Sequence, residues 1–136
     1  MSLSIWSGRK HFELGSASFL KAFFSTVVLQ LEGGRWGSKY PIIMRELYGG
    51  RLAYDRADAA LSELEQLRAA LSTLAPDRVV WDFENLSAKP PWGSAISQEI
   101  KSMDAYFVTS DGRNLLDVLG AALKEAAQSH RDLEIR

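Results

Sequence analysis

Residues 19–31, with the sequence FLKAFFSTVVLQL, form a strongly apolar segment. Its apolar side chains recur at steps of three and four residues, which places them on one broad face of a helix. They are Leu20, Phe23, Phe24, Val27, Val28 and Leu31. We therefore expect a buried helix here, with this face against the hydrophobic core.

The same segment resembles the apolar part of a signal peptide, because Arg9 and Lys10 precede it. It contains Lys21 and Gln30, however, and it has no clear small-residue cleavage site. It is also well short of the ~20 apolar residues that span a membrane. We expect a cytoplasmic protein without a membrane segment.

The residues before this helix predict a β-hairpin. Residues 3–6 and residues 10–14 each alternate between apolar and polar side chains, and Gly8 lies in the turn between them. A serine, Ser16 or Ser18, then caps the helix, and the glycine pair at 33–34 ends it.

Three further helices follow from the same kind of reasoning. A short helix over 42–48 has Pro41 at its start and a glycine pair after its end. The next helix has Asp55 as its N-cap, presents a stripe of alanine and leucine, and ends at Pro76. The last helix runs over about 114–129.

Two more strands are predicted at residues 78–83 and 105–109, with residues 133–135 as an edge strand. Strands come first and helices then alternate with strands, which favours an α+β class over a regular βαβ winding. We expect a single α+β domain over residues 1–136, with a small antiparallel or mixed sheet packed with about four helices.

Composition excludes several classes of protein. The 136 residues contain no cysteine, so disulfides, cysteine-based zinc sites and cysteine nucleophiles are absent. The formal net charge is −1, without a basic stripe of the kind that binds nucleic acid. We expect no nucleic-acid partner.

Asp82 and Glu84 are the first candidates for chemistry. Residues two apart on a strand share a face, so their carboxylates would point the same way and could hold a divalent metal or act as acid and base. His11 and His130 lie at opposite ends of the chain and suggest no triad. We expect no metal, cofactor or catalytic site, and keep a carboxylate-dependent enzyme centred on Asp82 and Glu84 as an alternative.

Asp111 lies in the turn at residues 110–113, which links a predicted strand to the last helix. An anion could bind at that helix N-terminus. A simple turn with Asp111 as the cap is the favoured interpretation.

Aromatic side chains in predicted loops point to a protein partner. Trp36, Tyr40 and Trp92 lie beside glycine, proline and serine, outside periodic runs. Tryptophan, tyrosine and arginine dominate interface hot spots because they bury a large area at modest entropic cost. The alternative is that Trp36 and Trp92 fold back over the core edge, which is equally compatible with the sequence.

Five segments occur in a recognisable order and spacing, and none is diagnostic alone. They are 36–41 (WGSKYP), 44–50 (MRELYGG), 80–82 (VWD), 90–93 (PPWG) and 106–112 (YFVTSDG). In this arrangement the chain resembles the bacterial immunity protein 70 family of polymorphic-toxin systems. The resemblance extends over about residues 15–123.

The resemblance implies an antidote that binds a cognate toxin domain and blocks it, without catalysis or a cofactor. The favoured mechanism is stoichiometric occlusion. Loops around Trp36 and Trp92 would supply apolar anchors, helped by Tyr40. Asp82, Glu84 or Asp111 would meet basic groups on the toxin.

A third possibility is a structural or regulatory module that self-associates through the aromatic loops. The sequence leaves the oligomeric state open.

Overall fold

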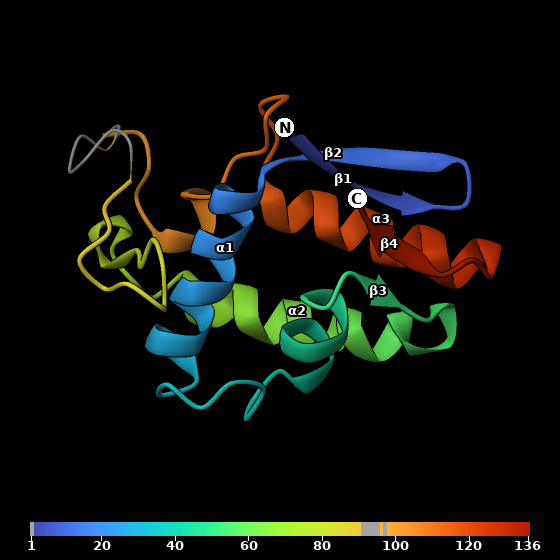
Figure 1. The fold of residues 1–136 in the computed structure, drawn as a ribbon, viewed down its shortest axis with the longest axis horizontal. Coiled ribbons are helices and arrows are strands. Elements are labelled where there is room, and N and C mark those ends of the chain that lie inside the picture. Colours follow the sequence, from blue (N-terminus) through green and yellow to red (C-terminus); the bar gives the residue numbers. More distant parts are fainter. Residues whose placement is uncertain (1, 91–95, 97) are drawn as a thin grey trace.

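The computed structural model describes residues 2–90, 96 and 98–136 (Figure 1). Four strands form one sheet: β1 (Ser2–Ser7), β2 (Lys10–Ser16), β3 (Arg51–Leu52) and β4 (Leu133–Ile135). The α-helices are α1 (Ala17–Thr26), α2 (Ala57–Leu71) and α3 (Leu115–Ser129), and two π-helical segments are η1 (Val27–Leu31) and η2 (Ile42–Leu47). Short 3₁₀ turns are η3 (Tyr54–Arg56), η4 (Pro76–Arg78) and η5 (Met103–Ala105).

The sheet has the order β2-β1-β4-β3, and every pairing is antiparallel. The predicted hairpin of β1 and β2 is confirmed, as is the α+β class. The prediction of residues 133–135 as an edge strand is wrong, because β4 pairs with β1 on one side and β3 on the other. The edge strands are β2 and β3, and β3 is a two-residue strand that the sequence did not reveal.

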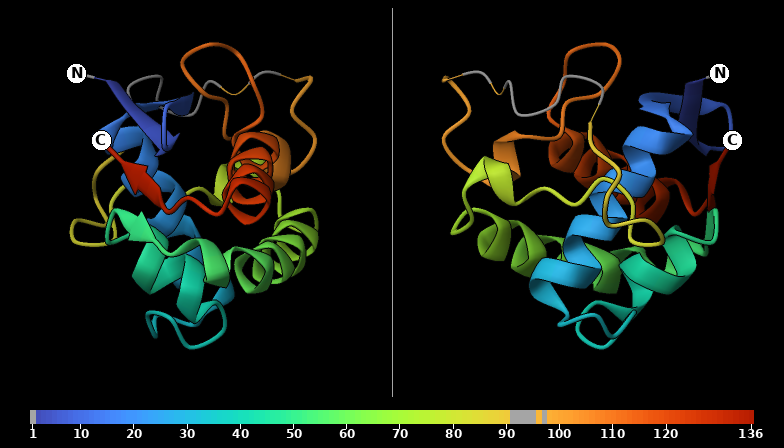
Figure 2. Two further views of the ribbon diagram at one scale, coloured as in Figure 1. Left: turned by 90° about the vertical axis from the view of Figure 1, so that its right-hand side faces the viewer. Right: turned by 60° about the vertical axis from the view of Figure 1, so that its left-hand side comes forward.

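Helices α1 and α3 pack against this sheet, and α2 packs against α3 and η2. Helix α3 contacts β1 and β2 and also packs along α2, while α1 contacts β2 and continues into η1 (Figure 2). The core between them contains Ile5, Phe23, Leu67, Phe107 and Leu119, none of which is exposed. In the part of the chain described here, no helix is long and apolar enough to cross a membrane.

Helix α1 begins as its sequence predicts, but it ends at Thr26, and the π-helical η1 continues the run to the predicted stop at the glycine pair. The Ser16 hydroxyl accepts a hydrogen bond from the Phe19 amide at 3.1 Å, which satisfies one free N–H of the first turn. After η1 the chain turns at Gly33 and Gly34, whose φ angles of 62° and 84° favour glycine, and the Gly34 amide donates to the Val28 carbonyl at 2.8 Å.

The strand predicted at residues 78–83 does not form, because side chains of α1 satisfy its backbone. The Val80 amide donates to the Thr26 hydroxyl at 3.0 Å and the Phe83 amide donates to the Ser25 hydroxyl at 2.9 Å. Ser25 and Thr26 are fully buried, so they bond to this segment in place of water. Residues 78–83 therefore run as an irregular segment against α1.

The strand predicted at residues 105–109 is also absent. Residues 103–105 form η5, and the segment contributes only a single bridge between Val108 and Asn114. The chain bonds to itself here: the Thr109 amide donates to the Arg113 carbonyl at 2.7 Å around the turn at Gly112.

Two predicted caps are wrong. The N-cap of α3 is Asn114 rather than Asp111, since the Asn114 side chain accepts from the backbone amides of Leu116 and Asp117. Asp55 lies in the first turn of η3, and Arg56 occupies the N-cap position of α2 without a side-chain hydrogen bond.

Replacement of Asn114 by alanine is expected to lower the free energy of unfolding by about 1–2 kcal/mol. The substitution removes the acceptor for two amides, at 2.9 and 3.2 Å, and the Nδ2 donor to the Asp104 carbonyl at 2.9 Å. Asn114→Asp keeps the acceptor at the helix N-terminus, so urea unfolding should show a smaller loss. Equal stability of the alanine variant and the wild type would rule out the capping role.

Candidate functional site

The loop that carries Trp36 is held by a buried carboxylate. Glu32 is only 4% exposed, and its two oxygens accept from the backbone amides of Gly37, Lys39 and Tyr40, each at 3.0 Å. Three amides converging on one carboxylate form strong, charge-assisted hydrogen bonds. The loop is therefore fixed in one shape before any partner arrives.

Trp36 is half-buried and packs between two other rings. Its ring centroid lies 4.8 Å from that of Tyr48 and 4.8 Å from that of Phe83, and its Nε1–H donates to the Met44 carbonyl. Tyr48 is 40% exposed and also meets Phe24 edge to face at 4.9 Å. We call Trp36, Tyr48 and Phe83 the aromatic cluster.

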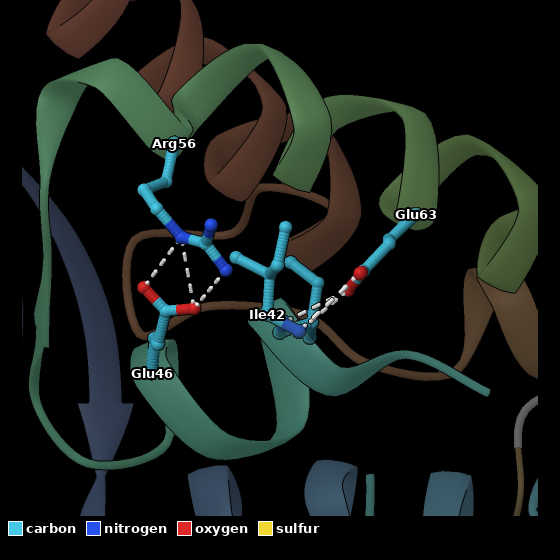
Figure 3. A network of polar contacts seen from close by, with 5 residues as sticks. Ile42, Glu46, Arg56 and Glu63 are labelled. Atoms are coloured by element: carbon cyan, nitrogen blue, oxygen red, sulfur yellow. Dashed lines mark hydrogen bonds and ion pairs between the residues drawn. The ribbon is translucent and has the colours of Figure 1, made fainter. Parts of the chain in front are cut away.

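The segment that precedes Tyr48 is anchored on α2 and on η3 by the pairings of two acidic side chains (Figure 3). Glu63 accepts from the amides of Ile42 and Ile43 at 3.0 Å, at the start of η2. Glu46 of η2 forms a two-point pair with the guanidinium of Arg56, with N–O distances of 3.0 and 2.7 Å. Both ends of η2 are thus fixed, and Tyr48 follows directly from a rigid segment.

Asp82 and Glu84 point to the same place, although they lie in a turn and not on a strand. The Lys21 ammonium lies 3.3 Å from Asp82 and 2.8 Å from Glu84, and 5.4 Å from the centroid of the Phe83 ring. The Glu84 amide donates to the Asp82 carboxylate at 2.9 Å, which closes the turn. We call Lys21, Asp82 and Glu84 the Lys21 cluster; its formal charge is −1.

The contacts of the Lys21 cluster shift the pKa values of Lys21 and Asp82. The hydrogen bond with Glu84, followed by the attraction of Asp82, raises the pKa of Lys21 above its ordinary 10.5. The backbone N–H of Glu84, helped by Lys21, lowers the pKa of Asp82 below its ordinary 3.8, against an opposing effect of desolvation. Both shifts favour the charged forms.

The pKa of Asp82 gives a testable pH dependence. Because the folded-state pKa lies below 3.8, the stabilisation from Asp82 is present above that pH and is lost as the pH falls through the folded pKa. A ¹³C NMR titration should place the Asp82 carboxyl midpoint below 3.8 in the wild type. Lys21→Met should raise the midpoint, but leave it low because the Glu84 amide remains. A wild-type midpoint at or above the ordinary value would contradict this assignment.

A cleft of about 380 Å³ adjoins both clusters. Its walls come from β1, the first turns of α1, the segment after η2 and β4. They are formed by Leu3, Ala17, Leu20, Lys21, Tyr48, Gly50 and Ile135. Lys21 belongs to the Lys21 cluster and Tyr48 to the aromatic cluster, so the cleft joins them into one continuous face. We call it the Tyr48 cleft.

The structure brings together three of the six predicted contact residues. Trp36, Asp82 and Glu84 meet around Phe83. Tyr40 is in the core at 5% exposure, and burial together with Glu32 raises the pKa of its hydroxyl above the ordinary 10.0. Tyr40 therefore supports the loop from inside.

Of the remaining two predicted contacts, the structure describes only Asp111. Asp111 is exposed in the turn before α3, where it accepts from the Thr109 hydroxyl and lies 3.8 Å from the guanidinium of Arg113. Trp92 lies outside the described residues. Asp111 is not among the residues that line the Tyr48 cleft.

Sequence reasoning missed Lys21 and Glu32 as organisers of this face. Lys21 is the one cation in the apolar segment 19–31, and Glu32 is the first acid after it. A lone charge within an apolar run is a signal that a partner lies close by in the fold. That signal could have pointed to both residues but not to their partners. Those of Lys21 come from a distant turn, and those of Glu32 from the loop that directly follows it.

The carboxylates of the Lys21 cluster do not form a metal site by themselves. Among residues 2–90, 96 and 98–136, no group of three or more histidine, aspartate or glutamate side chains could hold a metal ion. Lys21 occupies the space between the two carboxylates, so both already have a cationic partner.

Comparison with known families gives one match. The family model described as immunity protein 70 matches residues 4–135 of the 136-residue chain. No curated protein and no solved structure matches the chain.

Proposed function

The chain belongs to the immunity protein 70 family, and from this membership we propose that it is the antidote to a bacterial polymorphic toxin. It binds the cognate toxin domain in the cytoplasm of the producing cell and blocks it by stoichiometric occlusion. No step of this mechanism needs catalysis or a cofactor.

The observation that carries the proposed binding site is the rigid aromatic and acidic face around Phe83. Trp36 lies against this ring and Tyr48 lies against Trp36, while Asp82 and Glu84 flank Phe83 in sequence. Aromatic anchors surrounded by charged groups are typical of interface hot spots. The Glu32 carboxylate already orders the loop, so little conformational entropy is lost on binding.

Exposure within the face supports the same location. Leu86 follows Glu84 by two residues and is 67% exposed, and Tyr48 is 40% exposed. Both can therefore be covered by a partner without rearrangement of the core. The bound toxin would bury these apolar side chains and leave the charged groups at the rim, as in most tight complexes.

A growth-rescue experiment tests the proposal. The C-terminal domain of a candidate toxin, sought among genes adjacent to that of this chain, is expressed alone and together with this chain. Co-expression should restore growth, and light scattering of the purified pair should give the mass of a one-to-one complex. Toxicity unchanged by the chain, without a complex, would reject that toxin as the partner. The mass of the chain alone at several concentrations tests self-association separately.

A further inference from the structure

The residues of the proposed site also indicate what kind of partner side chain can bind there. The Tyr48 cleft ends at the Lys21 cluster, because Lys21 is a member of both. A partner segment that enters the cleft must therefore satisfy an apolar wall and an ionic rim at the same time. These two requirements restrict the side chains that can bind there.

The apolar wall has room for one large side chain. Leu3, Leu20 and Ile135 supply aliphatic surface, and the exposed Tyr48 ring closes one side. The volume of about 380 Å³ lies at the low end of the range of about 300–1,000 Å³ of ligand pockets. Lys21 is the only ionisable cation among the lining residues, and its ammonium is engaged at the rim.

The rim favours a cation from the partner. One ammonium faces two carboxylates, so the cluster keeps a formal charge of −1. The Glu84 side chain is 63% exposed whereas that of Lys21 is 33% exposed, so an approaching group meets the carboxylate more readily than the ammonium. The Phe83 ring further stabilises the Lys21 charge from its own side.

We propose that the Tyr48 cleft receives an apolar side chain of the toxin that is followed or preceded closely by a lysine or arginine, which pairs with Glu84 and Asp82. This inference rests on the proposed function. Lys21 then acts as a resident cation that partly neutralises the two carboxylates and moderates the attraction of the partner. Charge complementarity of this kind acts mainly on the association rate and on partner choice.

Stopped-flow association with the toxin domain tests the ionic part. Glu84→Gln should slow association roughly threefold to tenfold at low salt, with the difference shrinking at high salt. Lys21→Met removes the competing cation and should accelerate association by a similar factor. Asp117→Asn is the matched control, because the Asp117 side chain is 64% exposed and pairs with Arg68 on another face.

Filling the cleft tests the apolar part. Ala17 is exposed on α1 and lines the cleft, so Ala17→Leu should occupy it without disturbing the core and raise the dissociation rate about tenfold or more. Ala121→Leu, at an exposed alanine of α3 that lines a different groove, is the matched control and should bind like the wild type.

The possible outcomes separate this inference from the proposed function. If the wild type does not bind the toxin domain, the proposed function fails for that toxin. If the wild type binds but Glu84→Gln behaves like Asp117→Asn, or Lys21→Met slows association, the cationic partner is wrong. If Ala17→Leu dissociates from the toxin as slowly as Ala121→Leu, the cleft does not bind the toxin side chain.

Discussion

Replacement of Glu32 by alanine is expected to lower the free energy of unfolding by about 2–4 kcal/mol, because it leaves three backbone amides without an acceptor. These are the amides of Gly37, Lys39 and Tyr40, each 3.0 Å from a Glu32 oxygen. Glu32 itself is nearly inaccessible to solvent, so water does not replace the lost carboxylate without local opening. Urea unfolding measures the change.

Two further variants isolate the role of the carboxylate. Glu32→Gln keeps one acceptor oxygen but presents an amide donor to the remaining N–H groups, so its stability should lie between those of the wild type and Glu32→Ala. Glu65→Ala removes an exposed carboxylate of α2 and should cost less than about 0.5 kcal/mol. Amide hydrogen exchange at Gly37 and Tyr40 should accelerate in Glu32→Ala. Unchanged exchange there would contradict the account.

Replacement of Phe23 by alanine is expected to cost about 3–5 kcal/mol. Phe23 is fully buried, and its ring meets those of Phe24 and Phe107 edge to face at 5.2 and 5.3 Å. Its removal leaves a cavity between α1 and the segment before α3. Because small domains have a free energy of unfolding of about 5–15 kcal/mol, this one change removes a large share of it.

The size of the Phe23 effect is checked against a ring outside the centre of the core. Phe12 of β2 is only partly buried, so Phe12→Ala should cost clearly less. Urea unfolding should show a lower midpoint for Phe23→Ala with an unchanged slope, which indicates lost stability without a change in the surface exposed on unfolding. Equal losses for the two variants would contradict the central position of Phe23.

The sequence predicted the elements that follow from local periodicity. The hairpin of β1 and β2, the apolar face of α1 and the inward face of α3 all have spacings that report their structure directly. The errors lie where tertiary contacts override local pattern. Residues 78–83 are β-branched and aromatic, yet the buried hydroxyls of Ser25 and Thr26 bind their amides.

The candidate site shows the same division. Trp36 was identified as an aromatic side chain in a predicted loop, and Asp82 and Glu84 as two carboxylates on one face of a predicted strand. Their meeting around Phe83 was not predictable, since it depends on how the 32–41 loop and residues 80–84 pack against α1. Tyr40 lies in the same predicted loop as Trp36. Its backbone amide, however, donates a hydrogen bond to the buried Glu32 carboxylate, and its side chain lies in the core.

The central claim, neutralisation by stoichiometric occlusion, is tested most directly by titrating the activity of the toxin domain with this protein. Occlusion predicts a linear loss of activity that is complete at one molar equivalent, and an equivalence point unchanged by incubation time. Complete inactivation by a small fraction of an equivalent, increasing with time, would contradict occlusion and support a catalytic protein instead.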